Sequence, residues 1–286
     1  MTDIPNLTAL ADRYYAAGDF TRKAESYFRE YEQLLGPHRD VPLRILELGV
    51  SSGASLLLWR DYLPRATIVG IDINPMPAML AGQDRVHFLQ GSQDDLGLLD
   101  RAAAIAGGPF DLIVDDASHI GYLTKRSFNY LFRTWLKPGG TYVIEDFGTG
   151  YMPEYPDGGA FVPVRMQDAE PGTREFVGHQ FGMVGVVKQL VDHMMQQLMT
   201  GVAPPIQIAR LVVLTNIAFV EKSGEPAGPI GLDHPAAPEA VAAGVPDAAM
   251  VARVDALEQR LAAVETTLGR FLSRLEPLRR IKRLFG

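Results

Sequence analysis

Short runs of apolar residues alternate with stretches of helical periodicity along the first 222 residues. The runs place apolar side chains at consecutive positions, as in Leu112-Ile113-Val114, which is typical of strands that are covered on both faces of a parallel sheet. The pattern predicts strands at residues 44–50, 67–73, 86–90, 111–115 and 141–145.

Helical patterns occupy the intervals between these runs, for example residues 54–62, 127–135 and, after the last run, 184–199. Lys137-Pro138-Gly139-Gly140 predicts a turn between a helix and the strand that follows it. Two further apolar runs, 210–214 and 218–221, are separated by Thr215-Asn216 and predict a closing β-hairpin. The fold class that this alternation predicts is α/β, with an open sheet that ends in a hairpin.

The last 64 residues differ in character from the rest of the chain. Residues 223–249 are rich in Pro, Ala and Gly and predict a linker between a domain at 1–222 and a segment at 250–286. In that segment, apolar residues alternate at spacings of three and four, which predicts a coiled-coil helix and self-association through residues 250–278. These positions are Val254, Leu257, Leu261, Val264, Leu268, Phe271, Leu275 and Leu278. A helix that folds back on its own domain is the alternative.

Composition and charge exclude several classes of protein. The net charge of −7 argues against nucleic-acid binding, and the absence of cysteine excludes disulfides and thiolate metal sites. The amino terminus has no basic segment followed by an apolar run, so we expect no signal peptide and a cytoplasmic location.

Six basic residues and one acidic residue fall within positions 270–286. A solvated end is the favoured interpretation, and contact with an anionic membrane surface is the alternative.

A glycine-containing loop follows the first predicted strand. Its sequence, Gly49-Val50-Ser51-Ser52-Gly53, allows a sharp turn and a close approach of a ligand to the backbone. Asp72 ends the second strand, where a carboxylate can accept hydrogen bonds from a ribose diol. The spacing is not GxGxxG, which disfavours a nicotinamide dinucleotide site. A tight turn with a surface aspartate remains the alternative.

Acidic residues and a histidine follow the fourth and fifth predicted strands. Asp115, Asp116 and His119 come after the fourth strand, and Glu145 and Asp146 after the fifth. Ligands of open α/β sheets bind at this edge. If the two strands are neighbours, Asp116, Glu145 and Asp146 would converge on one hard cation such as Mg²⁺. The charge of histidine changes near neutral pH, so His119 is the predicted general base, with a structural helix cap as the alternative.

These segments together resemble a known family. ILELGVSSGAS, GIDIN, FLQGSQDD, DLIVDDASH and LKPGGTYVIED are similar to class I S-adenosylmethionine-dependent methyltransferases, and in particular to the metal-dependent sugar O-methyltransferases of natural-product tailoring. The resemblance covers about residues 24–222 and implies a Rossmann-like sheet. The family usually carries His-x-Tyr before the first strand, whereas this sequence has Glu25-Ser26-Tyr27.

The resemblance also implies roles for individual residues and a cofactor, S-adenosylmethionine. Glu47, Gly49 and Gly53 would hold its methionine and ribose moieties and Asp72 its ribose hydroxyls, while Ser92 and Gln93 would lie by its adenine. Asp115 would lie near its sulfonium and amino group. Asp116, Glu145 and Asp146 would ligate Mg²⁺, and His119 would be the base.

The implied reaction is Mg²⁺-dependent methylation of a sugar hydroxyl on a small-molecule glycoside. Segment 148–163, with Tyr151, Tyr155 and Phe161, would cover the acceptor. Methylation of a phenol or catechol is the alternative, since the same cation would chelate two adjacent oxygens. A non-catalytic domain that presents an oligomerising helix is a third interpretation.

Overall fold

The computed structural model describes residues 5–15, 22–160, 164–165, 177–201, 204 and 206–224. The predicted linker beyond residue 224 and the predicted coiled coil at 250–278 lie outside the described residues. Phe161 and the residues just after it lie outside them as well.

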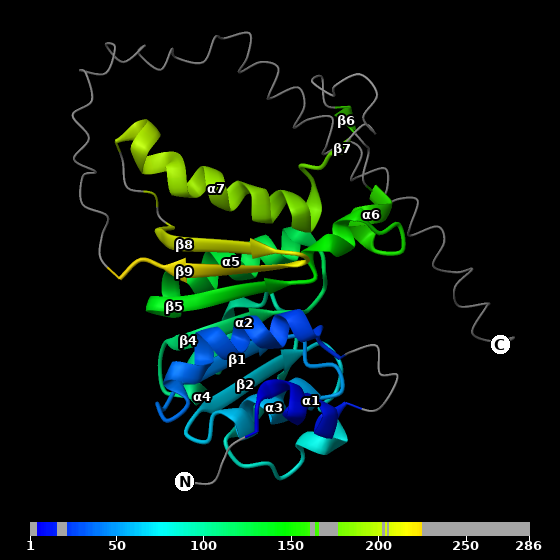
Figure 1. Cartoon of the computed structure of the whole chain (residues 1–286), viewed down its shortest axis with the longest axis vertical. Helices are drawn as coiled ribbons and strands as arrows, with labels where there is room; N and C mark the ends of the chain where they lie inside the picture. Colours follow the sequence, from blue (N-terminus) through cyan, green and yellow to red (C-terminus); the bar gives the residue numbers. More distant parts are fainter. Residues whose placement is uncertain are drawn as a thin grey trace, which may run out of the picture. The chain divides into compact units, whose positions relative to one another are not determined.

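Seven strands form one mixed sheet in the order β3-β2-β1-β4-β5-β9-β8 (Figure 1). The first five strands are parallel, and β9 pairs antiparallel with both β5 and β8. Their bounds are β1 Arg44–Leu48, β2 Thr67–Asp72, β3 Val86–Gln90, β4 Phe110–Asp115, β5 Leu136–Glu145, β8 Ile208–Leu214 and β9 Ile217–Lys222. A separate two-stranded ribbon pairs β6 Val164–Arg165 with β7 Val177–Gly178.

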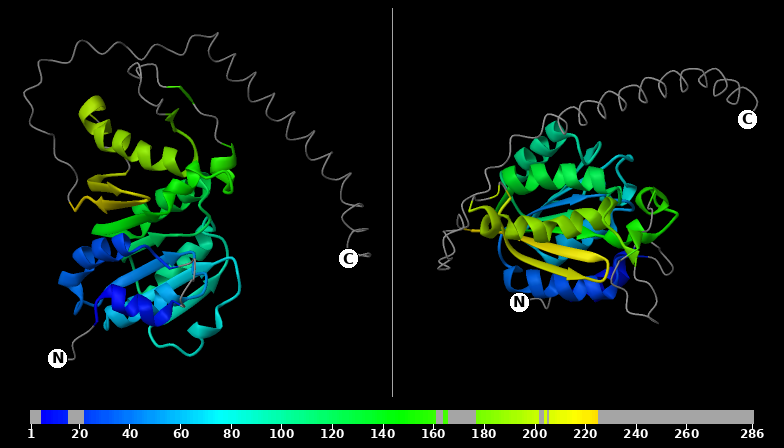
Figure 2. Two further views of the ribbon diagram at one scale, coloured as in Figure 1. Left: turned by 45° about the vertical axis from the view of Figure 1, so that its right-hand side comes forward. Right: turned by 90° about the horizontal axis from the view of Figure 1, so that it is seen from above.

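Helices flank the large sheet on both faces (Figure 2). Side chains from α1 Leu7–Tyr14, α2 Glu25–Leu35 and α3 Ala54–Tyr62 pack into one buried cluster. Side chains from α4 Leu96–Ala106, α5 Gly121–Thr134 and α7 Gly182–Thr200 pack into the other. Short elements complete the described chain: η1 Gly36–His38, η2 Ala78–Leu80, η3 Phe147–Tyr151 and α6 Pro156–Ala160.

Local sequence accounts for the ends of several helices. The Asn6 side chain caps α1 by accepting a hydrogen bond from the amide of Ala9, and Asp95 caps α4 in the same way. Gly107 ends α4 in the left-handed conformation that glycine tolerates best. Helix α2 buries Tyr27, Phe28, Tyr31 and Leu35 on one face, and this amphipathic stripe fixes the helix against the sheet.

The predicted α/β sheet with a terminal hairpin is confirmed, with differences at the ends of elements. Helix α5 begins at Gly121, six residues before the predicted start. Strand β5 begins at Leu136, so the predicted turn at Lys137-Pro138-Gly139-Gly140 lies within the strand. The pairing of β4 with β5 shifts register between Phe110 and Leu112, and this irregularity accommodates the Pro-Gly-Gly sequence.

Strand register brings the acidic residues to one edge. Leu48 of β1 lies opposite Asp115 of β4, which in turn lies opposite Ile144 of β5. Asp116 and Glu145 therefore emerge side by side at the carboxyl ends of neighbouring strands. Gly49 is required here, since a Cβ atom at this residue would lie 2.0 Å from the carbonyl oxygen of Asp116. None of the helices in the described ranges has the length and hydropathy of a membrane span.

Candidate active site

A cavity of about 850 Å³ opens at the carboxyl ends of the parallel strands, within the size range of small-molecule sites. Its walls come from the loops after β1, β2, β3, β4 and β5 and from the segment before α2. Most of the predicted site residues line it: Glu47, Gly49, Asp72, Ser92, Gln93, Asp116, His119, Glu145 and Asp146. The structure therefore brings together residues that are almost 100 positions apart in the sequence.

The backbone around this cavity is locally strained. In the part of the chain that the structure describes, five non-glycine residues have a left-handed backbone conformation. Four of the five line the cavity, namely Ser51, His119, Asp146 and Asn216. Such conformations cost roughly 1–3 kcal/mol each and concentrate at functional sites, so their placement here supports a functional cavity.

Asp72 organises the glycine loop. Its Oδ2 accepts hydrogen bonds from the amides of Val50 and Ser51 at 2.8 and 3.0 Å, and its Oδ1 accepts from the amide of Asn74 at 2.8 Å. Burial by itself raises the pKa of Asp72, but these hydrogen bonds outweigh it and lower the pKa below its ordinary value. The carboxylate is thus held charged at the end of β2, where a ribose diol would bind.

Two of the predicted cofactor residues do not line the cavity. Gly53 has φ of 91° and precedes α3, where a Cβ atom would approach Leu80 to 2.9 Å, so it shapes the turn. Asp115 is buried on the α5 side of the sheet, where it accepts hydrogen bonds from Tyr142 at 2.8 Å and Ser127 at 3.2 Å. Burial raises its pKa to about 6. Asp115 therefore takes part in an internal hydrogen-bond network in this structure, and its role near the cofactor stays a prediction.

Gln93 connects that internal network with the cavity. Its Nε2 donates to Asp115 at 3.2 Å, and its Oε1 accepts from the amide of Ser118 at 3.1 Å. Ser118 lies next to His119, so Gln93 fixes the loop that carries the histidine. Ser92 lines the cavity and donates to Asp94 at 2.6 Å.

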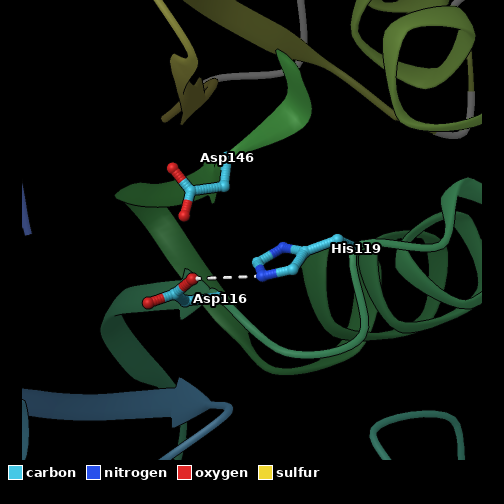
Figure 3. Close-up of side chains that lie close together, drawn as sticks. All are labelled: Asp116, His119 and Asp146. Atoms are coloured by element: carbon cyan, nitrogen blue, oxygen red, sulfur yellow. Dashed lines mark ion pairs between the residues drawn. The ribbon is translucent and has the colours of Figure 1, made fainter. Parts of the chain in front are cut away.

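Asp116, His119 and Asp146 converge on one point (Figure 3). One ligand atom from each residue lies within 4.8 Å of the others, and all three side chains are partly exposed. The imidazole Nε2 lies 4.0 Å from Oδ1 of Asp116, too far for a hydrogen bond. Nδ1 of His119 is buried and has no hydrogen-bond partner among the described residues. Nε2 is therefore the ring nitrogen that faces the carboxylate of Asp116, and Nδ1 is the one turned into the protein.

Glu145, the third predicted metal ligand, has different neighbours. Its Oε2 accepts from Nζ of Lys23 at 2.7 Å, and its Oε1 accepts from the hydroxyl of Tyr31. The side chain is buried, and burial raises the pKa of Glu145 above its ordinary value. Both of its oxygens are engaged by the protein, so its role as a ligand stays a prediction.

Asp146 is held by two residues to which the sequence analysis gave no role in the site. Its Oδ1 accepts from the Tyr27 hydroxyl at 2.8 Å and from Nδ2 of Asn216 at 2.7 Å. Burial, followed by the charge of Asp116, raises the pKa of Asp146. Asn216 comes from the β8–β9 turn, far along the chain from Asp146, and nothing in the local sequence indicates this contact.

Lys23 is the most important residue that the sequence analysis missed. Its ammonium lies 2.8 Å from Asp116, 2.7 Å from Glu145 and 3.2 Å from Glu47. Burial alone lowers the pKa of Lys23, but the charges of Asp116, Glu145 and Glu47 outweigh it, so the net pKa is well above its ordinary value. Lys23 lies just before α2, where Ala24 is extended, so no helical spacing in the sequence indicates its position in the site.

Of the predicted acceptor cover, Tyr155 lines the cavity. Its ring meets the His119 ring edge-on, with centroids 5.7 Å apart. Tyr151 instead packs edge-on against His179, with centroids 4.7 Å apart. The described part of segment 148–163 therefore contributes one aromatic side chain next to the histidine.

Comparison with solved structures identifies the class of this fold. The chain matches MycE, a methyltransferase from the mycinamicin biosynthetic pathway solved in complex with Mg, SAH and mycinamicin VI, at a TM-score of 0.62. The two are 31% identical over 77% of this chain and 54% of MycE. No family model matches the chain. The fold is that of the S-adenosylmethionine-dependent methyltransferases, as the sequence predicted.

Relatives of known function narrow the class. The chain is 37% identical over 213 residues to a tetracenomycin rhamnosyl 3'-O-methyltransferase of Streptomyces olivaceus, covering 70% of this chain and 50% of that protein. It is 33% identical over 241 residues to mycinamicin VI 2''-O-methyltransferase of Micromonospora griseorubida, covering 79% and 55% respectively. The homologues are sugar O-methyltransferases of antibiotic pathways, which confirms the resemblance. The chain spans about half the length of these relatives.

Proposed function

We propose that this chain transfers a methyl group from S-adenosylmethionine to a hydroxyl of a sugar on a small-molecule glycoside, with the help of Mg²⁺. The observation that carries the proposal is the convergence of Asp116, His119 and Asp146 in a cavity that the glycine loop also lines. The sugar O-methyltransferase relatives and the Mg and SAH bound to MycE support it.

The acidic residues fit a magnesium ion. Mg²⁺ prefers oxygen ligands and keeps several waters, so one oxygen from each of two carboxylates suffices. Oδ1 of Asp116 faces the cluster, and Oδ2 of Asp146 has no hydrogen-bond partner within the described ranges. Asp116 and Asp146 would hold the ion, and we keep Glu145 as the third predicted ligand. When bound, Mg²⁺ would lower the pKa of the acceptor hydroxyl and fix its orientation.

The protein residues supply the remaining chemistry. The acceptor oxygen attacks the methyl carbon in line with the sulfur, so the new O–C bond forms as the S–C bond breaks. His119 accepts the hydroxyl proton at Nε2, and the carboxylate of Asp116 stabilises the resulting imidazolium. The loops after β1, β2 and β3 orient the donor, and this alignment lowers the barrier by holding the reacting atoms in contact.

The test is an assay of methyl transfer to a panel of glycosides and phenols, with and without Mg²⁺. We expect turnover with glycosides and dependence on the metal. Turnover with phenols or catechols only would favour the alternative acceptor class. No S-adenosylmethionine binding in titration would favour the non-catalytic interpretation, which the relatives do not support.

Replacement of Asp72 tests the cofactor site. We expect Asp72→Asn to weaken SAH binding by roughly 10- to 100-fold, since a hydrogen bond to a charged group contributes about 1.5–3 kcal/mol. The loss has two sources, a weaker contact to ribose and a less ordered glycine loop. Isothermal titration calorimetry measures it. Asp84→Asn is the matched control, because Asp84 lies on the surface outside the cavity. Equal affinities for SAH in the two variants would refute the assignment.

Self-association of residues 250–278 and a cytoplasmic location are proposed from the sequence pattern alone. We expect truncation at Gly224 to give a smaller oligomer by light scattering while methyl transfer is retained. The reason is that the predicted coiled-coil positions lie beyond the truncation, and the cavity residues lie before it. The same oligomeric state in both proteins would rule out the coiled-coil interpretation.

A further inference from the structure

A buried aspartate anchors a surface segment beside the candidate active site. The segment follows β5 and comprises η3, the loop after it and α6, residues 147–160. Of residues 151–160, all of which the structure describes, Asp157 is the only buried one, with an exposed fraction of 5%. Burial of a carboxylate is costly unless hydrogen bonds compensate for the lost water, so this side chain requires partners in the interior.

The partners of Asp157 are amides at the beginnings of two helices. Its Oδ2 accepts hydrogen bonds from the amide of Gly121 at 2.7 Å and from the amide of Met183 at 2.8 Å. Gly121 begins α5 and Met183 is the second residue of α7, so neither amide has a partner within its own helix. A Cβ atom at Gly121 would collide with the backbone of Gly182, so glycine is what allows the two helices to share one carboxylate. The partial positive charge at the amino ends of helices favours an anion here.

The same carboxylate connects the two aromatic rings that face the acceptor space. Gly121 comes two residues after His119, and Asp157 comes two residues after Tyr155. The rings of His119 and Tyr155 meet edge-on with centroids 5.7 Å apart, and both residues line the cavity. His119 has φ of 52°, a conformation that persists only where the surrounding contacts maintain it. The position of Tyr155 relative to the predicted base therefore depends on Asp157.

A second contact holds the other end of the segment. Nδ1 of the buried His179 accepts from the amide of Phe181 at 3.2 Å, which assigns the ring hydrogen to Nε2, and Nε2 donates to the carbonyl of Gly150 at 2.6 Å. Tyr155 lies between the anchors at Gly150 and Asp157, and its side chain is exposed. An exposed aromatic ring in a cavity gives the apolar C–H face of a sugar a surface on which to pack.

We propose that Asp157 is a positioning residue, which holds Tyr155 against the acceptor sugar and keeps that sugar within reach of His119. The inference rests on the proposed function and deepens it, because it names the residues that orient the acceptor. Asp157 contacts neither the donor nor the acceptor in this scheme, and it acts through Tyr155 and through the loop that carries His119. A displacement of about 1 Å at the reacting groups can cost roughly 100-fold in rate, so the anchoring of this segment affects turnover.

Removal of the shared acceptor tests the proposal in the full chain. We expect Asp157→Ala to lower kcat/KM by roughly 10- to 100-fold for the glycoside of the panel that is methylated fastest, through both a higher KM and a lower kcat. SAH affinity should be nearly unchanged, because Asp72 and the glycine loop are not altered. Asp157→Asn keeps an oxygen in the same place and should retain most of the wild-type activity. Glu154→Ala is the matched control, since Glu154 is exposed, belongs to the same segment and does not line the cavity.

A double-mutant cycle distinguishes positioning from general stabilisation. Tyr155→Ala replaces an exposed side chain, so we expect a folded protein with a raised KM for the glycoside. Addition of Asp157→Ala to this variant should raise KM little further, because the ring that Asp157 holds is already absent. A residue that only stabilised the domain would give additive effects. Hydrogen–deuterium exchange in SAH-saturated protein should be faster over residues 150–160 and the first turn of α5 in Asp157→Ala, and unchanged in β1 and β4.

The outcomes separate this inference from the proposed function. Wild-type KM in Asp157→Ala or in Tyr155→Ala, in a protein that methylates glycosides, would overturn the positioning role alone. Equal losses of glycoside and SAH affinity in Asp157→Ala would show that Asp157 supports the whole domain, and would overturn it as well. A loss of activity in Asp157→Asn as large as in Asp157→Ala would refute the hydrogen bonds as its basis. Absence of methyl transfer to every glycoside by the wild type would overturn the proposed function.

Discussion

Removal of divalent metal with EDTA is expected to abolish methyl transfer and to leave SAH binding largely intact. The reason is the separation of the two sites within the cavity. The carboxylates of Asp116 and Asp146 lie after β4 and β5, whereas the glycine loop follows β1 and Asp72 ends β2. A sugar hydroxyl is a poor nucleophile at neutral pH. The ion would lower the pKa of this hydroxyl, so we expect its loss to abolish methyl transfer.

The matching substitution is Asp116→Asn, which keeps the size of the side chain and removes one charge. We expect it to cost activity far more than stability, because the side chain is partly exposed and contributes little to the core. Turnover, Mg²⁺ affinity by calorimetry and the thermal midpoint are measured together, with Asp84→Asn as the control. Full activity in metal-free buffer would exclude the metal-dependent mechanism.

His119→Ala is expected to lower turnover by roughly 10²–10⁴, the usual effect of removing a general base. Nε2 of His119 lies 4.0 Å from Oδ1 of Asp116, too far for a hydrogen bond, so this nitrogen is available to accept the proton of the acceptor hydroxyl. Binding of SAH should be nearly unchanged, because the residues around Asp72 and Gly49 are not altered. Initial rates at saturating substrate and SAH titration give the two quantities.

His87→Ala is the matched control for this experiment. His87 lies on β3 with an exposed side chain and is absent from the cavity wall. We expect it to retain wild-type turnover. A His119 variant with wild-type turnover between about pH 6 and pH 9 would show that the histidine is structural, and the base would have to be sought elsewhere.

Sequence patterns were sufficient to predict the strands and the edge at which the site forms. Consecutive apolar residues predict parallel strands because both faces of the sheet are covered, and β3 matches its prediction at both ends. The residues that follow parallel strands must share one edge of the sheet. Asp116, His119 and Asp146 could therefore be predicted as neighbours from their places in the chain.

Two patterns in the sequence did not predict the local structure that forms. A Pro-Gly-Gly sequence normally indicates a turn, and in this chain residues 137–140 lie within β5 because an irregular pairing with β4 accommodates them. Asp115 and Asp116 look equivalent in the sequence. Since successive residues of a strand point to opposite faces, one lies in the interior beside Tyr142 and the other in the cavity.

The tertiary structure alone decided which cation balances each carboxylate. Lys23 precedes α2, and its partners Asp116 and Glu145 lie 93 and 122 residues further on, so only the packing of that segment against the sheet brings them together. The sequence by itself determined that acidic groups would gather at the carboxyl edge, because each of them directly follows a predicted strand and the carboxyl ends of parallel strands share one edge. It did not determine how their charge is divided between an internal lysine and a metal, because that depends on distances of a few ångströms between separate elements.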